Sequence, residues 1–115
     1  MTSIVVRPAS GGAVTITGPL AREIARAAGA DLWVSGVRGQ PGLEARAYAV
    51  RSVDGEPAVD GVLARDGDRI VLVTPAGRRT ITQPLQALRG MIGARVWLVG
   101  PLDGTIASYG VLREP

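Results

Sequence analysis

The sequence contains no cysteine, histidine, lysine, phenylalanine or asparagine. Without cysteine, neither disulfides nor thiolate metal sites can form. Histidine, cysteine and lysine are the usual general bases and nucleophiles, and a phosphate-binding loop of the Walker type requires a lysine. We therefore expect a protein that is not an enzyme and that uses no cofactor.

Long apolar runs are missing as well. No stretch approaches the ~18 to 20 consecutive apolar residues of a membrane span, and the N-terminus lacks the basic and apolar segments of a secretory leader. We expect a soluble chain without a membrane span. A leader or lipid anchor upstream of Met1 is compatible with the sequence, which indicates neither the compartment nor the oligomeric state.

The residues that are present indicate a small β-rich protein. Of the 115 residues, 46% are hydrophobic and 20% charged, and the 16 glycines and 8 prolines fall between short apolar runs. This pattern is typical of one compact domain with many tight turns. All basic residues are arginines, 13 against 10 acids, which leaves a formal net charge of only +3. This usage, together with abundant Ala, Gly, Val and Pro, is typical of a GC-rich bacterial genome.

The chain repeats itself, and a repeated segment indicates one structural unit used twice. Four short stretches recur in the same order with small differences in spacing. They are residues 4–9 and 70–76, 15–20 and 80–85, 29–36 and 93–100, and 48–50 and 109–111.

Each repeat is predicted to fold as two strands, a short helix and two further strands. Runs rich in β-branched residues at 4–6 and 14–17, and again at 70–73 and 80–82, predict the first two strands. The third strand carries Trp33 or Trp97 and the fourth Tyr48 or Tyr109. Prolines are expected at the first helical position, glycines just after the helix, and one apolar stripe along it. The residues concerned are Pro19 and Pro84, Gly29 and Gly93, and the stripes Leu20, Ile24 and Ala27 or Ala28, and Leu85, Leu88 and Ile92.

The second repeat gains a leading strand from the segment between the repeats. Residues 60–64 form an apolar run that Asp66-Gly67 joins to the strand beginning at Arg69, and Asp-Gly between apolar runs is typical of a hairpin. Residues 57–115 therefore run strand, strand, strand, helix, strand, strand. That order, with the glycine-bounded fourth strand at 93–100, resembles the OB-fold family of five-stranded barrels.

The resemblance implies a mainly β fold with two short helices and duplicated ββαββ units packed as one body. Residues 1–56 would be an incomplete OB-like repeat without a leading strand, left open or completed by another segment. Residues 57–115 would be a full one. The duplication also favours an alternative, a single pseudo-twofold barrel of the double-psi type.

The two Trp-bearing strands have one aliphatic face and one mixed face, because side chains alternate along a strand. Leu32, Val34, Val96 and Leu98 lie on the aliphatic faces and are predicted to be core. The Trp side chains share their faces with charged residues, so they either pack between the repeats or form a recognition surface. The candidate recognition surface comprises Trp33, Trp97, Arg95, Tyr48, Tyr109, Arg78 and Arg79.

The acidic residues are densest at Asp66-Gly67-Asp68, with Asp54, Glu56 and Asp60 upstream. Carboxylates of this kind can bind Ca²⁺, but no EF-hand spacing is present, and Asp is favoured in tight turns for conformational reasons. We interpret these residues as turn residues and expect no metal site.

The expected function is that of a binding or interaction module whose partner is a protein, a small ligand or a cell-envelope component. The resemblance to OB-folds implies one alternative, the binding of single-stranded nucleic acid, in which bases stack on aromatic side chains beside basic ones. With aromatics at 3% of the chain and arginines interspersed with acids, such binding is expected to be weak. It requires Arg38, Arg46, Arg51, Arg78, Arg79 and Arg113 to converge, whereas a partner-binding module is expected to expose an apolar strip.

Overall fold

The computed structural model describes residues 4–6, 13–39 and 42–115, which form nine strands and two short helices. The mainly β architecture with two short helices is therefore confirmed. The elements are β1 (Ile4–Val6), β2 (Val14–Thr17), α1 (Ala21–Ala25), β3 (Ala30–Arg38), β4 (Leu43–Val53), β5 (Glu56–Asp66), β6 (Arg69–Thr74), β7 (Gly77–Ile81), α2 (Gln86–Arg89), β8 (Arg95–Val99) and β9 (Ser108–Arg113).

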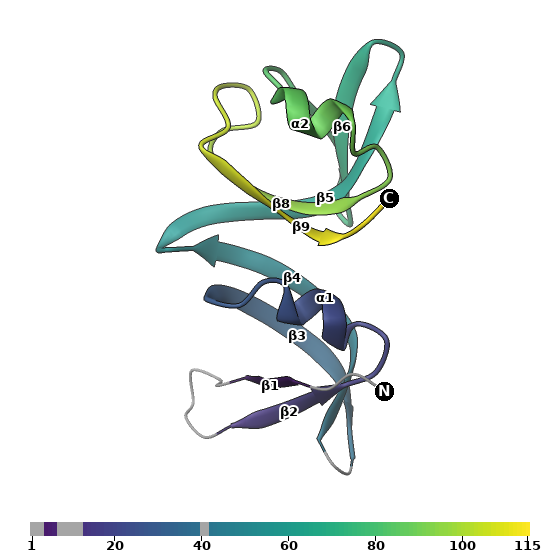
Figure 1. Ribbon diagram of the computed structural model, residues 1–115, viewed down its shortest axis with the longest axis vertical. Helices are drawn as coiled ribbons and strands as arrows, with labels where there is room; N and C mark the ends of the chain where they lie inside the picture. The colour runs from purple at the N-terminus through teal and green to yellow at the C-terminus, as the bar shows by residue number, and fades with distance from the viewer. Residues whose placement is uncertain (1–3, 7–12, 40–41) are drawn as a thin grey trace.

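The strands are arranged in two lobes along the 46 Å long axis (Figure 1). We call the described residues up to Val53 the first lobe and residues from Glu56 onward the second lobe. Each lobe has a buried cluster of its own, centred on Ile16 and Ile24 in the first and on Leu72 and Leu98 in the second. Leu112, 1% exposed, belongs to the second lobe but is buried in the cluster of the first, so the lobes pack directly on each other.

In the second lobe the strand pairings, together with one isolated bridge, run around the buried cluster. β5, β6 and β7 pair successively as antiparallel neighbours, and β5 also pairs with β8, which pairs with β9. A parallel bridge between Gln83, just after β7, and Thr105, just before β9, links the remaining two sides. The sheet of this lobe curls accordingly around its buried cluster.

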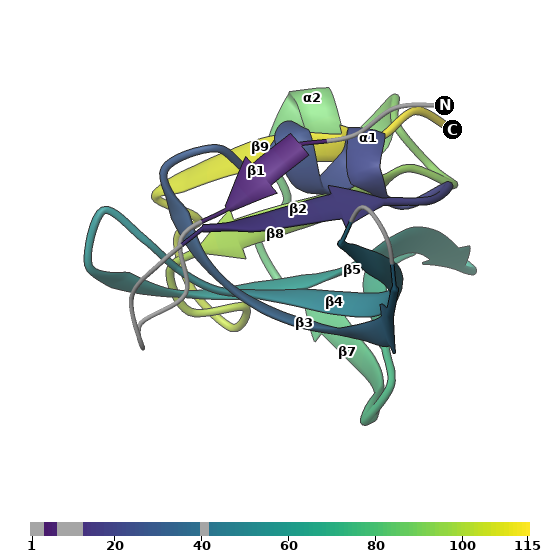
Figure 2. The ribbon, with the colours of Figure 1, turned by 90° about the horizontal axis from the view of Figure 1, so that it is seen from below.

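The strand pairings of the first lobe do not run around its buried cluster in this way. β1 pairs with β2, β2 pairs in parallel with β4, and β4 pairs with β3. Among the described residues β3 pairs only with β4, and β1 only with β2. The first lobe is therefore a curled but open sheet, with β1 and β3 at its two edges (Figure 2).

A tight hairpin between β4 and β5 joins the two lobes. Asp54 and Gly55 both have positive φ, 52° and 80°, as a two-residue turn of the I′ type requires. Only two residue pairs follow the turn, Ser52 with Pro57 and Val53 with Glu56. Beyond them β5 leaves β4 and pairs with β8.

Both helices are short, and they begin later than the prolines suggested. Pro19 and Pro84 each lie one residue before the N-cap residue, Leu20 or Leu85, so the prediction that the prolines occupy the first helical position is wrong. Leu85 is extended, with ψ at 149°, which delays the start of α2. Gly29 and Gly93 follow the helices with φ of 88° and 97°, a conformation that strains any other residue. Neither helix in the described part of the chain has the length needed to cross a membrane.

Candidate functional site

The boundary between the lobes holds the most deeply placed charged pair of the described chain, Asp60 and Arg95. The Asp60 Oδ1 atom accepts hydrogen bonds from Arg95 Nε at 3.0 Å and Arg95 Nη2 at 2.7 Å. The other carboxylate oxygen accepts from the backbone N–H of Val50, and Arg95 Nη2 also donates to the carbonyl of Tyr48 at 2.7 Å. The side chains of Asp60 and Arg95 are only 5% and 18% exposed. Asp60 lies just beyond the point where β4 and β5 separate, so its carboxylate supplies the acceptor that a paired strand would otherwise give to Val50.

Tyr48 and Glu23 extend this network into the first lobe. The Arg95 guanidinium lies 3.7 Å above the centre of the Tyr48 ring, and Tyr48 Oη donates to Glu23 Oε1 at 2.8 Å. Arg113 Nη1 lies 3.6 Å from the second oxygen of Glu23. Burial raises the pKa of Tyr48 well above its usual 10.0, and its hydrogen bond to Glu23 raises it further. Tyr48 is thus a neutral hydrogen-bond donor.

The hydrogen bonds and ion pairs of this network link the two lobes. In the described residues no buried side-chain nitrogen or oxygen lacks a hydrogen-bond partner, so the buried polar atoms of the network are already engaged. Asp60, Arg95 and Arg113 come from the second lobe, whereas Tyr48, Val50 and Glu23 come from the first. The network therefore fixes the orientation of one lobe against the other.

The two tryptophans have different surroundings. Trp97 packs against the cluster of the first lobe, and its indole lies on Gly110 of the neighbouring strand, where a Cβ atom would overlap the ring. Trp33 lies opposite Ala49 in the corresponding place on β3 and is 45% exposed. Only Trp97 is therefore covered by the other lobe.

The aliphatic faces of β3 and β8 also differ in burial. Val96 and Leu98 are 0% exposed, as predicted for core residues. Leu32 and Val34, predicted to be core in the same way, pack against the cluster of the first lobe but are only half-buried. Val37, further along β3, is 55% exposed. Trp33 and Val37 lie on the same face of β3, because side chains alternate along a strand, and we call these two exposed apolar side chains the β3 strip.

The other members of the candidate recognition surface lie apart from Trp33. Tyr48, Arg95 and Trp97 come together at the lobe boundary, where Tyr48 is buried and the other two are half-buried. Tyr109 packs against the cluster of the second lobe. Arg78 and Arg79 are exposed on β7, in the other lobe from Trp33.

The arginines that a nucleic-acid site requires are partly engaged with acids. Arg46 lies 3.5 Å from Glu44, and Arg113 is paired with Glu23. Arg38 and Arg51 are exposed on the first lobe, and Arg78 and Arg79 on the second.

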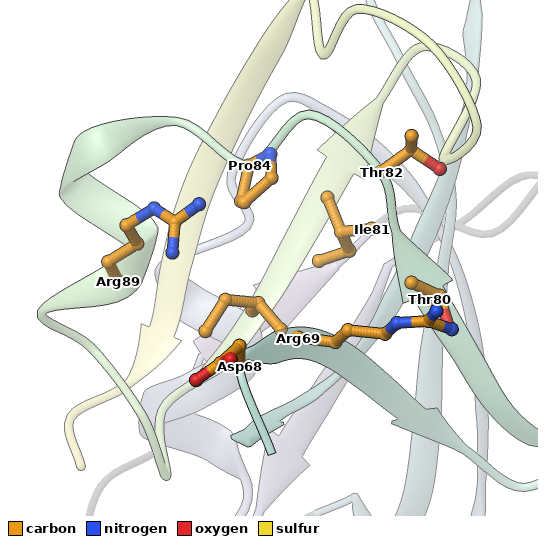
Figure 3. A pocket seen from close by; sticks show the side chains of 8 residues that line it. Asp68, Arg69, Thr80, Ile81, Thr82, Pro84 and Arg89 are labelled. Carbon is orange, nitrogen blue, oxygen red and sulfur yellow. The ribbon is translucent and has the colours of Figure 1, made fainter. Parts of the chain in front are cut away.

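A hollow of about 380 Å³ lies on the second lobe between α2, β6 and β7 (Figure 3). Ile81 and Pro84 form its inner wall, and Arg89 extends from α2 toward Pro84. Most of its polar lining residues are exposed, and no deeply buried polar group points into it. The remaining lining residues are Asp68, Arg69, Ile70, Thr80 and Thr82.

Acidic side chains do not gather in a way that suits a metal ion. Within the described segments no group of three or more His, Cys, Asp or Glu side chains could hold one. Asp66 ends β5 and pairs with Arg69 across the hairpin turn, in which Gly67 has a φ of 63°. Asp66 and Asp68 thus stand in a hairpin turn, the conformation for which Asp is favoured.

Sequence reasoning did not identify Asp60 and Glu23 as members of the inter-lobe network. A signal for Asp60 was present, because it stands inside the apolar run Val59-Asp60-Gly61-Val62, and a carboxylate in a buried strand needs a partner. Glu23 carried no such signal, because an acid on a short helix is usually solvated.

Comparisons with protein-family models, with curated proteins and with solved structures found no match to the chain.

Proposed function

We propose that the chain is a non-enzymatic interaction module, an internal duplication of two OB-type lobes, that binds a protein partner at the β3 strip. The observation that carries the proposal is the uncovered strip itself, with Trp33 45% and Val37 55% exposed on the same face of β3. Exposed apolar side chains gathered in one place are a common mark of protein contact surfaces.

The strand registers of the two lobes support the duplication. The order strand, strand, helix, strand, strand of β1 to β4 recurs in β6 to β9, and the register of β3 on β4 matches that of β8 on β9. Both pairings have an irregularity at the same place, between Asp31 and Leu32 and between Arg95 and Val96. The matching pairs are Leu32–Val50 with Val96–Val111, Trp33–Ala49 with Trp97–Gly110, and Val34–Tyr48 with Leu98–Tyr109.

The first hairpins and the parallel contacts support it as well. Ile4 pairs with Ile16 as Ile70 pairs with Ile81. A parallel contact follows in both lobes, between β2 and β4 in the first and between Gln83 and Thr105 in the second.

The circuit of pairings in the second lobe supports the OB-type assignment. Its five strands follow the spatial order β5-β6-β7-β9-β8, in which a single bridge between Gln83 and Thr105, outside the strands, links the β7 and β9 sides. The helix lies between the third and fourth strands in sequence. This is the arrangement of a five-stranded Greek-key barrel of the OB type. The first lobe has counterparts for β6 to β9 and none for β5 among the described residues.

Single-stranded nucleic acid is the second candidate, and the surroundings of Trp33 disfavour it. Bases stack on aromatic side chains that lie beside basic ones, but the neighbour of Trp33 on the same face of β3 is Asp31. A carboxylate at that place repels a phosphate backbone.

Site-specific photo-crosslinking tests the proposed function. A photoreactive amino acid replaces Val37 on the β3 strip, or, as matched control, Arg79 on β7, which is also exposed, in cells that make the protein. We expect discrete protein adducts from position 37 only, unchanged by nuclease treatment. Nucleic-acid adducts at position 37, or the same set of adducts at both positions, would contradict the proposal.

A further inference from the structure

We infer that the outer edge of β3 is a strand-acceptor site, at which an extended segment of a partner protein with a basic residue opposite Trp33 takes the place that β5 takes in the second lobe. The inference rests on the proposed function and names the chemistry of the partner. Addition of a strand to an exposed sheet edge is a general mode of peptide recognition, in which backbone hydrogen bonds give affinity and side chains give specificity.

The second lobe shows what occupies this place. β5 runs antiparallel to β8 and sets Gly61 opposite Val96, Asp60 opposite Trp97 and Val59 opposite Leu98. With this strand in place, Val96 and Leu98 are 0% exposed. Their counterparts on β3, Leu32 and Val34, have no such strand beside them in the described chain and are half-buried. A strand added beside β3 would cover Leu32 and Val34 as β5 covers Val96 and Leu98.

Backbone groups just before β3 and just before β8 show the same difference. In the second lobe Gly93 N–H donates to the Leu63 carbonyl at 2.8 Å, and Leu63 N–H donates to the Ala94 carbonyl at 2.9 Å. Gly29 is the counterpart of Gly93, and its N–H makes no backbone hydrogen bond of this kind within the described residues. An added strand would supply the acceptor.

The charge of the acceptor edge defines the residue that the partner brings. Arg95 of β8 is held by Asp60, which comes from the strand beside it. On β3 the counterpart of Arg95 is Asp31, which is exposed and accepts a 2.9 Å hydrogen bond from Ser52. The charge at this place is thus reversed, and a basic side chain opposite Trp33 lies where Asp60 lies in the second lobe.

A second copy of the chain does not meet this requirement through its own β3. When two β3 edges pair with two-fold symmetry, the same face of both strands lies on the same side of the combined sheet. The residue opposite Trp33 would then come from the same alternating set as Trp33 itself. That set is Asp31, Trp33, Ser35 and Val37, and it contains no basic residue. Charge therefore favours a strand from another protein.

Two labelled peptides test the inference against the full-length chain. One has the sequence of residues 57–66, and the other has the same sequence with Asp60→Arg. We expect the Asp60→Arg peptide to bind about five- to ten-fold more tightly in fluorescence anisotropy, since opposite charges across a strand pair attract and like charges repel. The chain variant Asp31→Arg should reverse this preference. Asp103→Arg, at an exposed acid of the second lobe, is the matched control and should leave it unchanged.

Hydrogen exchange locates the binding, and the outcomes separate the two claims. We expect the Asp60→Arg peptide to slow amide exchange in β3 and leave β8 unchanged. Binding without charge preference, slowing elsewhere than in β3, or no binding of either peptide at 1 mM (of the order of the weakest specific interactions) would overturn the strand-acceptor site. So would a β3-dependent dimer in analytical ultracentrifugation. Protein adducts at position 37 would still support the proposed function in each of these cases.

Discussion

Asp60 stands in an apolar run of β5, yet both of its carboxylate oxygens accept hydrogen bonds within the protein. Two atoms of the Arg95 guanidinium donate to one carboxylate oxygen and the Val50 N–H donates to the other. Charge-assisted hydrogen bonds of this geometry are about twice as strong as neutral ones. Removal of one partner leaves the other charge buried without compensation.

Asp60→Ala is therefore expected to lower the free energy of unfolding by about 3 to 5 kcal/mol, because it leaves both the Arg95 charge and the Val50 N–H unpaired. Urea denaturation measures the effect. Glu44→Ala is the control, since the Glu44–Arg46 pair is well exposed on both sides and should contribute less than about 1 kcal/mol. Similar losses for the two variants would show that the network does not hold the lobes together.

Tyr48 makes stability sensitive to alkaline pH. Burial and the hydrogen bond to Glu23 raise the pKa of Tyr48 in the folded protein above its ordinary value of 10.0. Its contribution is fully present below pH 10. Above pH 10 the unfolded chain loses the phenolic proton while the folded protein keeps it, so the free energy of unfolding falls by up to about 1.4 kcal/mol per pH unit.

Tyr48→Phe should remove this slope, as measured by urea denaturation at several pH values between about 8 and 11, a range set by the ordinary tyrosine pKa. Tyr109→Phe, which deletes a phenol from the cluster of the second lobe, is the matched control and should retain the slope. A slope that survives in Tyr48→Phe would mean that Tyr48 ionises as readily in the folded protein as in the unfolded chain.

At the scale of elements, β3 and β8 occupy similar positions in their lobes but differ in the number of strands that pair with them. β8 is paired on both edges, with β5 and β9, whereas β3 is paired with β4 alone in the described chain. Side chains on the aliphatic face of β3 should therefore contribute less to stability than those of β8.

The same substitution on both strands tests this difference. Leu98→Ala should cost about 2 to 5 kcal/mol, because it leaves a cavity at a fully buried position. Leu32→Ala should cost about half as much or less, since its side chain is only half-buried and folding removes less of its apolar surface from water. Chemical denaturation compares the two variants directly. Equal costs would show that β3 is as well covered as β8.

Local pattern was sufficient to predict most of the elements. The β-branched runs and the alternation around Trp33 and Trp97 predicted the strands close to their observed places, whereas the helices end at Ala25 and Arg89, before the glycines that were expected to stop them. The length of β5 was underestimated, because the sequence favoured residues 60–64 and the strand spans Glu56–Asp66. Pairing with three other strands, β4, β6 and β8, extends it beyond its apolar run.

The surroundings of Arg95 and Tyr48 could not be predicted in the same way. Alternation placed Arg95 on the face of Trp97, but nothing local indicates that the first lobe covers this face. The partner of Arg95 is 35 residues away in sequence, and the Tyr48 carbonyl that it also contacts is 47 residues away. Contacts at that range depend on how the lobes pack, which the repeat pattern alone leaves undetermined.

At the scale of the whole molecule, the two lobes differ in how their strands are paired and packed. The second lobe supplies the strands β8 and β9, whose outer faces carry Trp97 and Leu112 into the cluster of the first lobe. The first lobe is thereby supported from one side, and its edge at β3 is unpaired within the described chain. The central claim is that this edge is unpaired in the free protein.

Residue-resolved amide hydrogen exchange by NMR tests that claim most directly. In β8, paired on both edges, all amides should exchange slowly. In β3, amides that point toward β4 should be protected, while alternate amides on the free edge should exchange as quickly as exposed turns. Uniform protection along β3 equal to that of β8 would show that the edge is already occupied and would contradict the account.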